Sequence, residues 1–320
     1  MTNESAPRVS IGMPVYNAGR FLRAALDSIL SQTFEDFELI ISDNGSIDST
    51  QEICKEYAAK DARIAYYRND KNRGASWNYN RVTELAKGVY IKHAAHDDLL
   101  APEYVARCVE VLDREPSVVL CYPRTTFIDE QGNPIGKGEN TLDLRSNRPH
   151  ERFKRYHELI NENSMCDPVF GLFRASALKK TPVVASFTGS DMLLLGEMAL
   201  LGRIYELPEY LFYERWHGGT SVHQFPTLAE RAQWFDPSNK GKLWTYVMHW
   251  RWLVEYLKAI GRVSMSPYEK LMCYVQMLRW CWLQKRALLT DLVEAAVEIG
   301  KRLSNVSCKA CARTSSQTAK

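Results

Sequence analysis

Acidic and amide side chains stand where predicted strands end in this 320-residue chain. Asp43 closes one strand just before Gly45, where its carboxylate would face a ligand and accept a hydrogen bond from a nucleobase N–H. Asp97 and Asp98 follow another strand as adjacent carboxylates. Such a pair suits a hard divalent cation that keeps several waters and takes further oxygens from a diphosphate. Neighbouring acids are also common on solvated loops, so spacing alone leaves both interpretations open.

The elements that must position these residues alternate between β-rich runs and helical patterns from Arg8 to about Tyr122. We expect strands over 9–13, 37–42, 64–67, 89–94 and 118–122, with amphipathic helices between them. This alternation is typical of βαβ units and a mostly parallel, doubly wound sheet. Such sheets bind ligands beyond the carboxyl ends of their strands, where the acidic residues lie.

The remainder of the chain changes from mixed to helical patterns. We expect a hairpin at 127–134, a polar loop at 137–150, a helix at 151–162, a strand at 169–173, a helix at 191–201 and strands at 203–207 and 211–215. After a domain boundary near residue 226 the pattern predicts helices at 228–235, 243–260, 267–285 and 287–303. The polar tail from 304 to 320 is expected to be flexible.

Composition excludes several classes of protein. A formal charge of only +3 argues against a nucleic-acid binder. The N-terminal residues lack a secretory signal, and charges interrupt every apolar stretch long enough to span a membrane. Eight scattered cysteines include one lone CxxC at Cys308 and Cys311, without a second pair to complete a zinc site. We therefore expect a cytoplasmic protein with reduced thiols.

Five segments occur in the order seen in a known enzyme family. They are residues 9–50, "NRGASWNYN", "GVYIKHAAHDDLLAPEYV", "GSDMLLL" and "YLFYERWHGGTS". Together they resemble the inverting glycosyltransferases of family 2, over roughly residues 8–220. The resemblance implies a GT-A fold over 1–226, with a nucleotide-binding half at 8–122, an acceptor half at 123–226 and a helical extension at 227–303. It also implies transfer of a sugar from a UDP-, GDP- or dTDP-sugar to a glycan or lipid-linked acceptor, in cell-surface polysaccharide or glycoconjugate synthesis.

The resemblance assigns roles residue by residue. Nucleotide contacts are implied for Pro14, Tyr16, Asn17, Asp43, Asn72, Gly74, Asn80 and His96. Asp97 falls on the metal-binding carboxylate, with Asp98 beside it and His217 as a further contact to Mn²⁺ or Mg²⁺; His223 is the alternative histidine. Asp191 falls on the base that activates the acceptor. Two positions depart from the family pattern, because Ala95 and Ser190 stand where acids are usual.

Three other functions would require different sequence features. A sugar-nucleotide nucleotidyltransferase would carry a Gly-rich, basic loop after the first strand, and "PVYNAGRF" has a single Gly. A dinucleotide-dependent dehydrogenase would need a GxGxxG there. A catalytically silent, glycosyltransferase-like binding module is kept open by Ala95 and Ser190.

Charge is distributed unevenly along the chain. Residues 242–320 hold thirteen Lys and Arg against five Asp and Glu, a charge of +8, whereas the first 241 residues carry −5. Five tryptophans lie among these cations, as suits a helical surface that contacts an anionic membrane. The alternative is that these helices pack on the catalytic domain or on a second subunit. The sequence thus predicts a cytoplasmic enzyme, peripheral at the inner membrane face.

Overall fold

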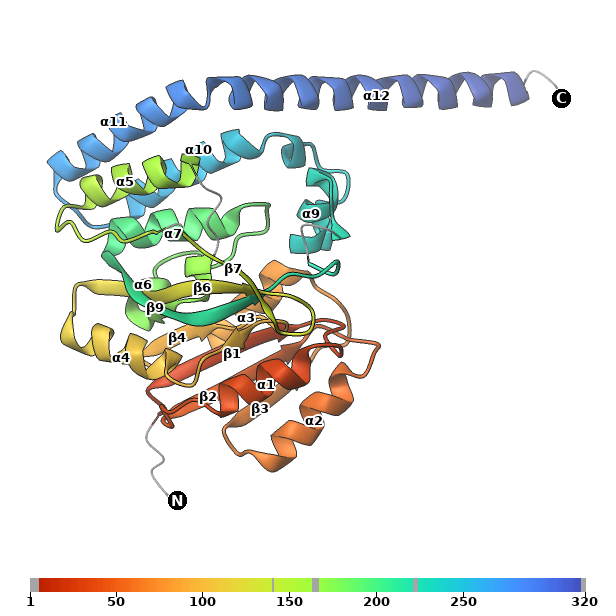
Figure 1. The fold of residues 1–320 in the computed structure, drawn as a ribbon. Coiled ribbons are helices and arrows are strands. Elements are labelled where there is room, and N and C mark those ends of the chain that lie inside the picture. The colour runs from red at the N-terminus through yellow and green to blue at the C-terminus, as the bar shows by residue number, and fades with distance from the viewer. Residues whose placement is uncertain (1–5, 140, 163–166, 221–223, 318–320) are drawn as a thin grey trace.

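The computed structural model describes residues 6–139, 141–162, 167–220 and 224–317, and within them nine strands form one sheet (Figure 1). The strand order is β3-β2-β1-β4-β8-β6-β9-β5, and β7 pairs with β6. The strands are β1 (Val9–Val15), β2 (Phe37–Asp43), β3 (Ile64–Arg68), β4 (Tyr90–His93), β5 (Leu99–Leu100), β6 (Val118–Ile128), β7 (Pro134–Lys137), β8 (Leu172–Arg174) and β9 (Arg203–Arg215). The sheet therefore joins both halves of the predicted enzyme domain.

The first four strands of this sheet are parallel. β1 pairs with β2 and β4, and β2 pairs with β3, so the five strands predicted from Arg8 to Tyr122 are confirmed. β1 and β2 are nearly continuous apolar runs because both faces of this sheet are covered. The carboxyl ends of β1, β2 and β4 consequently meet at one edge.

Helices pack on both faces of the sheet, and the buried side chains on each face form one hydrophobic cluster. One face packs α1 (Leu22–Leu30), α2 (Thr50–Lys60) and α4 (Tyr104–Arg114). The other face packs α3 (Ala75–Leu85), α5 (Pro149–Glu162), α6 (Ala175–Leu178), α7 (Ser190–Leu201), α10 (Met248–Arg262) and α11 (Pro267–Leu283). The fold is a doubly covered α/β sheet, as predicted.

The second half of the sheet is mixed rather than parallel. β8 runs antiparallel to β4 and β6, and β5 runs antiparallel to β9, whereas β6 and β9 are parallel. The two strands predicted at 203–207 and 211–215 are one strand, because Pro208 falls in a bulge between the pairs Pro123–Leu207 and Arg124–Tyr210. A bulge tolerates proline, which cannot donate a ladder hydrogen bond. The strand predicted at 169–173 is instead a 3₁₀ turn at Asp167–Phe170 followed by the short β8.

The C-terminal helices do not form a separate domain core. α10 and α11 bury Tyr256, Ile260, Met277 and Trp280 in the same cluster as α5 and α7. The boundary predicted near residue 226 therefore does not separate two cores. The shorter α9 (Leu228–Phe235) begins with a capping box, in which the Thr227 side chain accepts from the Glu230 backbone N–H.

The last helix, α12 (Lys285–Gln317), runs past the body of the molecule (Figure 1). It extends through the segment from 304 that we expected to be flexible, since each added helical residue contributes a further backbone hydrogen bond. Cys308 and Cys311 lie in this segment, where side chains are outside the described part of the chain. Among the described helices, none has the length and apolar character needed to cross a bilayer.

Candidate active site

Asp97 and His217 meet at the edge of the sheet. Asp97 follows β4, His217 follows β9, and the antiparallel pairing of Leu99 with Tyr213 brings the two loops together. A hydrogen bond of 2.9 Å joins His217 Nε2 to Asp97 Oδ2. Burial alone would raise the pKa of the Asp97 carboxyl, but His96 and His217 together lower it below its usual value. Asp97 is therefore an ionised carboxylate beside two imidazoles.

Asp98 has a different environment from its neighbour. Its Oδ1 accepts a hydrogen bond of 2.9 Å from the Arg215 backbone N–H, and the side chain is buried. Burial, followed by the charge of Asp97, raises the pKa of the Asp98 carboxyl well above its usual range. The structure thus turns Asp98 toward β9, whereas Asp97 faces His217.

Arg215 connects three segments around these carboxylates, and the sequence reasoning did not identify it. Its Nε donates to the Asp97 carbonyl at 2.8 Å, and its Nη1 donates to the carbonyls of Asp129 and Glu130 at 3.0 and 3.1 Å. A buried guanidinium is costly unless its donors are paired, so these carbonyls define its position. The only sequence signal was an arginine two residues before His217.

Arg215→Lys is expected to lower kcat by between about tenfold and a hundredfold, because one ammonium cannot reach the carbonyls on both loops and Asp97 would lose its position. The concentration of Mn²⁺ for half-maximal activity should rise in parallel, which a loss of stability alone would not produce. The matched control is Arg20→Lys, whose ion pair with Glu130 is solvent-exposed. Unchanged metal dependence in Arg215→Lys would exclude this positioning role.

The expected nucleotide-binding loops also meet at this edge. Asn17, which has a positive φ of 50°, accepts a hydrogen bond of 3.0 Å from the Ile47 N–H, and its own N–H donates to Ser46 Oγ at 2.9 Å. Tyr16 beside it is 43% exposed, so its ring is open to a ligand. Pro14 lies within β1, and the loop of Tyr16 and Asn17 that follows this strand is joined to the loop after Asp43.

Asp43 itself lies beneath that loop. Its Oδ1 accepts from the Ser46 N–H and its Oδ2 accepts from the Tyr66 hydroxyl, each at 2.8 Å, while Arg68 Nε lies 3.5 Å from Oδ2. The side chain is fully buried. In this structure Asp43 shapes the loop rather than lying open to a nucleobase.

Asn72 and Gly74 contact the loop after β2, whereas Asn80 contacts the loop before α7. Asn72 Oδ1 accepts from Asn44 Nδ2 and from the Gly74 N–H, which holds this segment against the loop after β2. Asn80 has a partner that the sequence did not suggest: its Nδ2 donates to the Val184 carbonyl and its Oδ1 accepts from the Val184 N–H, both at 3.0 Å. Both ends of the Asn80 amide are thus used to hold the loop before α7.

Asp191 lies in the first turn of α7, after Gly189. A φ of 80° and the packing of Trp252 on its Cα require glycine at position 189. Asp191 Oδ1 is buried and has no hydrogen-bond partner among the described residues. A helix N-terminus stabilises the carboxylate, and the unpartnered oxygen remains able to accept a proton.

The pKa of the Tyr79 phenol responds to all three of these acids. Burial, followed by the charges of Asp97, Asp98 and Asp191, raises the pKa of its phenol. Its ring also packs on His93 with centroids 5.4 Å apart. The predicted base and the predicted metal ligand, 94 positions apart in the chain, therefore act on the same side chain.

The Asp97–His217 pair fits the divalent cation that the resemblance implies. A carboxylate and an imidazole are suitable donors for Mn²⁺, and His96 Nδ1 lies 4.0 Å from Asp97 Oδ1. Within the described ranges no three His, Cys, Asp or Glu side chains form a metal cluster. The protein would thus supply few ligands, as is usual where substrate phosphates and waters complete the coordination. His223 lies outside the described residues.

Part of this chain is similar in sequence to known proteins. Chondroitin synthase of Escherichia coli is 34% identical over 139 residues, which are 43% of this chain and 20% of that protein. The putative glycosyltransferase EpsH of Bacillus subtilis is 32% identical over 123 residues, 38% of this chain and 36% of that protein. The matched region thus spans well under half the length of these relatives.

A solved structure shares the fold, and a family model matches the sequence. The structure is S. aureus TarS 1-349 in complex with UDP-GlcNAc, with a TM-score of 0.54 and 19% identity over 93% of this chain and 92% of that one. The model of glycosyl transferase family 2 matches residues 10–181, more than half of the chain. The chain therefore belongs to glycosyl transferase family 2 and is a glycosyltransferase with the GT-A fold.

Proposed function

We propose that this glycosyltransferase moves a sugar from a nucleotide-sugar donor to a glycan or lipid-linked acceptor, with inversion, in a single displacement. The observation that carries the proposal is the Asp191 carboxylate in the first turn of α7, whose Oδ1 has no partner among the described residues, together with the Asp97–His217 pair. An inverting transfer needs one group that takes the acceptor proton and one that stabilises the leaving diphosphate. The chain has a candidate for each role.

In the proposed reaction the Asp191 carboxylate takes the proton of the acceptor hydroxyl as the hydroxyl oxygen attacks the anomeric carbon. Asp97 and His217 would hold Mn²⁺ or Mg²⁺, which when bound offsets charge on the leaving diphosphate. Arg215 and Asp98 keep the Asp97 loop in place, and the loop of Tyr16 and Asn17 lies where the nucleotide would bind. A glycosidase would instead place two carboxylates across the bond, with water as the acceptor.

The names of the relatives support a role in making polysaccharide or glycoconjugate. One relative is a chondroitin synthase, and the structural neighbour was solved with UDP-GlcNAc. The experiment that tests the proposal incubates the full chain with Mn²⁺ and a panel of UDP-, GDP- and dTDP-sugars. Thermal shift reports which donor binds, and release of nucleoside diphosphate with a glycan acceptor mixture reports transfer.

The outcomes separate the alternatives. Donor-dependent thermal shift with acceptor-stimulated release of nucleoside diphosphate supports the proposed transferase. A silent binding module would give the shift without release under any acceptor, and a nucleotidyltransferase would release pyrophosphate from a nucleoside triphosphate and a sugar phosphate. Either result would contradict the proposal.

We also propose contact with an anionic membrane through α11 and α12. α11 has two apolar faces: Cys273, Met277 and Trp280 lie in the core, while Leu278 and Trp282 on the opposite side are 71% and 69% exposed. Apolar residues on all sides are typical of a helix that is covered on all sides. The exposed face continues on α12 with Leu289, Leu292 and Val293, within the segment of charge +8.

Replacing Leu278 and Trp282 together by Glu is expected to reduce binding to vesicles rich in phosphatidylglycerol by about tenfold or more, because burial of two large apolar side chains is lost. Cosedimentation at low and high salt measures the binding of the full chain, since removing everything after residue 226 would open the core. Ile135→Glu, at an exposed apolar residue on β7, is the control. Equal binding by the double variant and the control would rule out this contact surface.

A further inference from the structure

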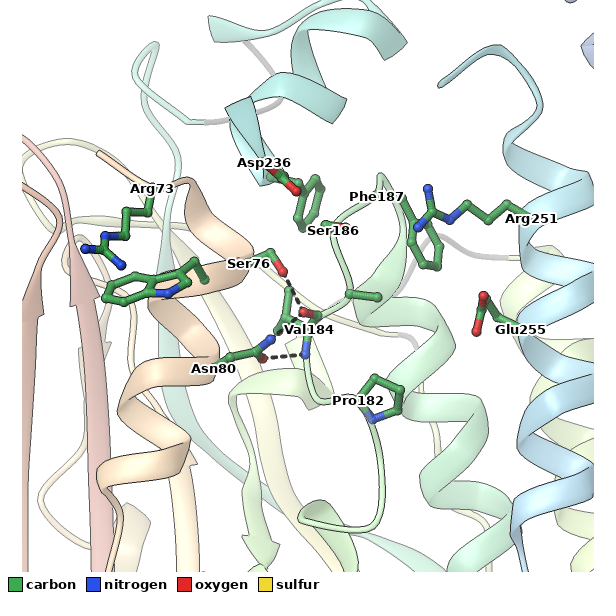
Figure 2. A pocket seen from close by; sticks show the side chains of 13 residues that line it. Arg73, Ser76, Asn80, Pro182, Val184, Ser186, Phe187, Asp236, Arg251 and Glu255 are labelled. Atoms are coloured by element: carbon green, nitrogen blue, oxygen red, sulfur yellow. Dashed lines mark hydrogen bonds between the residues drawn. The ribbon is translucent and has the colours of Figure 1, made fainter. Parts of the chain in front are cut away.

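A cavity lies behind the loop that leads to Asp191, and none of the groups assigned to the proposed reaction lines it. It has a volume of about 460 Å³ and lies between α3, the loop before α7, the end of α9 and the start of α10 (Figure 2). Aromatic side chains form much of its wall: Trp77 from α3, Phe187 from the loop and Phe235 from α9. Flat aromatic faces of this kind stack against the C–H faces of sugar rings, so the cavity has walls suited to a saccharide.

Two arginines give this cavity its polarity. The Arg73 guanidinium lies 4.7 Å from the centre of the Trp77 ring, and the Arg251 guanidinium lies 4.3 Å from that of Phe187. Figure 2 shows Arg73 and Arg251 on opposite sides of the cavity. Stacking uses the planes of the two guanidiniums and leaves their N–H edges open to a ligand.

The acidic residues of the cavity are already engaged. Asp236 Oδ1 accepts from the Ser238 N–H at 2.8 Å, and Glu255 forms an ion pair of 2.8 Å with Lys258. Neither Arg73 nor Arg251 has an ion pair with any carboxylate in the described part of the chain. Both acids also act electrostatically on Arg251, but they leave the N–H groups of the two guanidiniums without a carboxylate partner of their own within the described ranges. Such N–H groups match a carboxylate or phosphate through paired hydrogen bonds.

The loop before α7 lines the cavity and also leads to Asp191, the proposed base. Ser76 Oγ donates to the Val184 carbonyl at 2.6 Å, and Asn80 bonds both backbone groups of Val184 (Figure 2). The same loop continues to Gly189, which packs on Trp252, and then to Asp191. The loop that lines the cavity is therefore continuous in the chain with the residue proposed as the base.

We propose that this cavity binds an anionic saccharide segment of the acceptor, with the carboxylate or phosphate held by Arg73 and Arg251. The assignment to the acceptor rests on the proposed function, whereas the binding of an anionic saccharide does not. The cavity would thus make the enzyme prefer acidic acceptor chains over neutral ones.

Binding of labelled oligomers to the full chain, without donor, tests this proposal. The probes are a uronate-containing oligosaccharide, a phosphodiester-linked polyol oligomer and a neutral oligosaccharide of equal length, followed by fluorescence anisotropy. We expect at least one anionic probe to bind about tenfold more tightly than the neutral one, and the probe that binds identifies the anionic group. Arg251→Met should weaken that binding about tenfold, and the double variant R73M/R251M should weaken it further.

Matched variants separate charge from packing. Arg251→Lys keeps the charge but loses the paired N–H groups, so its affinity is expected to lie between those of the parent protein and Arg251→Met. Arg286→Met removes an exposed arginine on α12 and should change nothing. In activity assays R251M should raise the acceptor KM with little change in the donor KM. Equal affinity for neutral and anionic probes, or full affinity in R73M/R251M, would overturn the proposal. Binding that depends on Arg251 in a protein that never releases nucleoside diphosphate would instead overturn only the proposed function.

Discussion

Asp191→Asn is expected to abolish sugar transfer, with kcat lowered by about a thousandfold or more, while binding of the nucleotide sugar stays nearly intact. The amide keeps the size of the carboxylate but cannot take a proton from the acceptor hydroxyl, and general base catalysis contributes factors of roughly 10² to 10⁴. Oδ1 of Asp191 has no protein partner among the described residues, so the substitution breaks no hydrogen bond of that oxygen within this part of the chain. Rates of nucleoside diphosphate release, compared with donor affinity from titration calorimetry, measure the two effects separately.

Ser190→Ala is the matched control for this substitution. Ser190 precedes Asp191, and its hydroxyl is likewise buried without a partner in the described part of the chain. Removal of the hydroxyl should leave kcat close to that of the parent protein, because Ser190 takes part in no proton transfer of the proposed reaction. Normal turnover in Asp191→Asn would refute the assignment of the base.

Asp97→Ala is expected to remove metal dependence and activity together. The substitution deletes the carboxylate that pairs with His217, and so one of the two groups proposed to hold the cation. Metal stabilisation of a leaving group supplies several kcal/mol, so the rate should fall by at least about a hundredfold. Activity measured against Mn²⁺ concentration, together with the thermal shift that Mn²⁺ causes in the presence of nucleotide, tests both expectations.

Asp98→Asn should behave differently from Asp97→Ala. An asparagine Oδ1 can still accept the hydrogen bond from the Arg215 backbone N–H, so the loop should remain in place and Mn²⁺ should still be required. Burial already favours the neutral form of Asp98, so loss of its charge has a small effect on folding. If Asp98→Asn also ended metal dependence, both acids would be ligands and the division of roles proposed above would be wrong.

The strands and helices that carry the site were predictable because their signals are local. Apolar runs at 9–13 and 37–42, and helical spacing after them, report burial over a few residues. The mixed half of the sheet was less predictable. β8 has only three residues, and β9 continues past Pro208 through a bulge that exists only because β6 lies beside it. Strand direction depends on such partners and not on local sequence.

The roles of single residues likewise depended on distant partners that local sequence does not show. The adjacent acids Asp97 and Asp98 looked equivalent in sequence. In the structure Asp98 accepts a hydrogen bond from the Arg215 N–H on β9, whereas Asp97 pairs with His217, which follows β9. Asn80 appeared beside the nucleotide, but it bonds Val184, more than a hundred positions away. Arg215 was missed because its partners are backbone carbonyls, which leave no trace in residue types.

Residue types and their order were enough to predict the family, the candidate base at Asp191, the candidate metal ligand at Asp97 and the excess of positive charge after residue 241. They did not reveal that His217 pairs with Asp97, that α10 and α11 complete the core, or that α11 keeps a second apolar face exposed. Periodicity shows which side of a helix is apolar, whereas packing between distant segments selects the neighbour that covers that side.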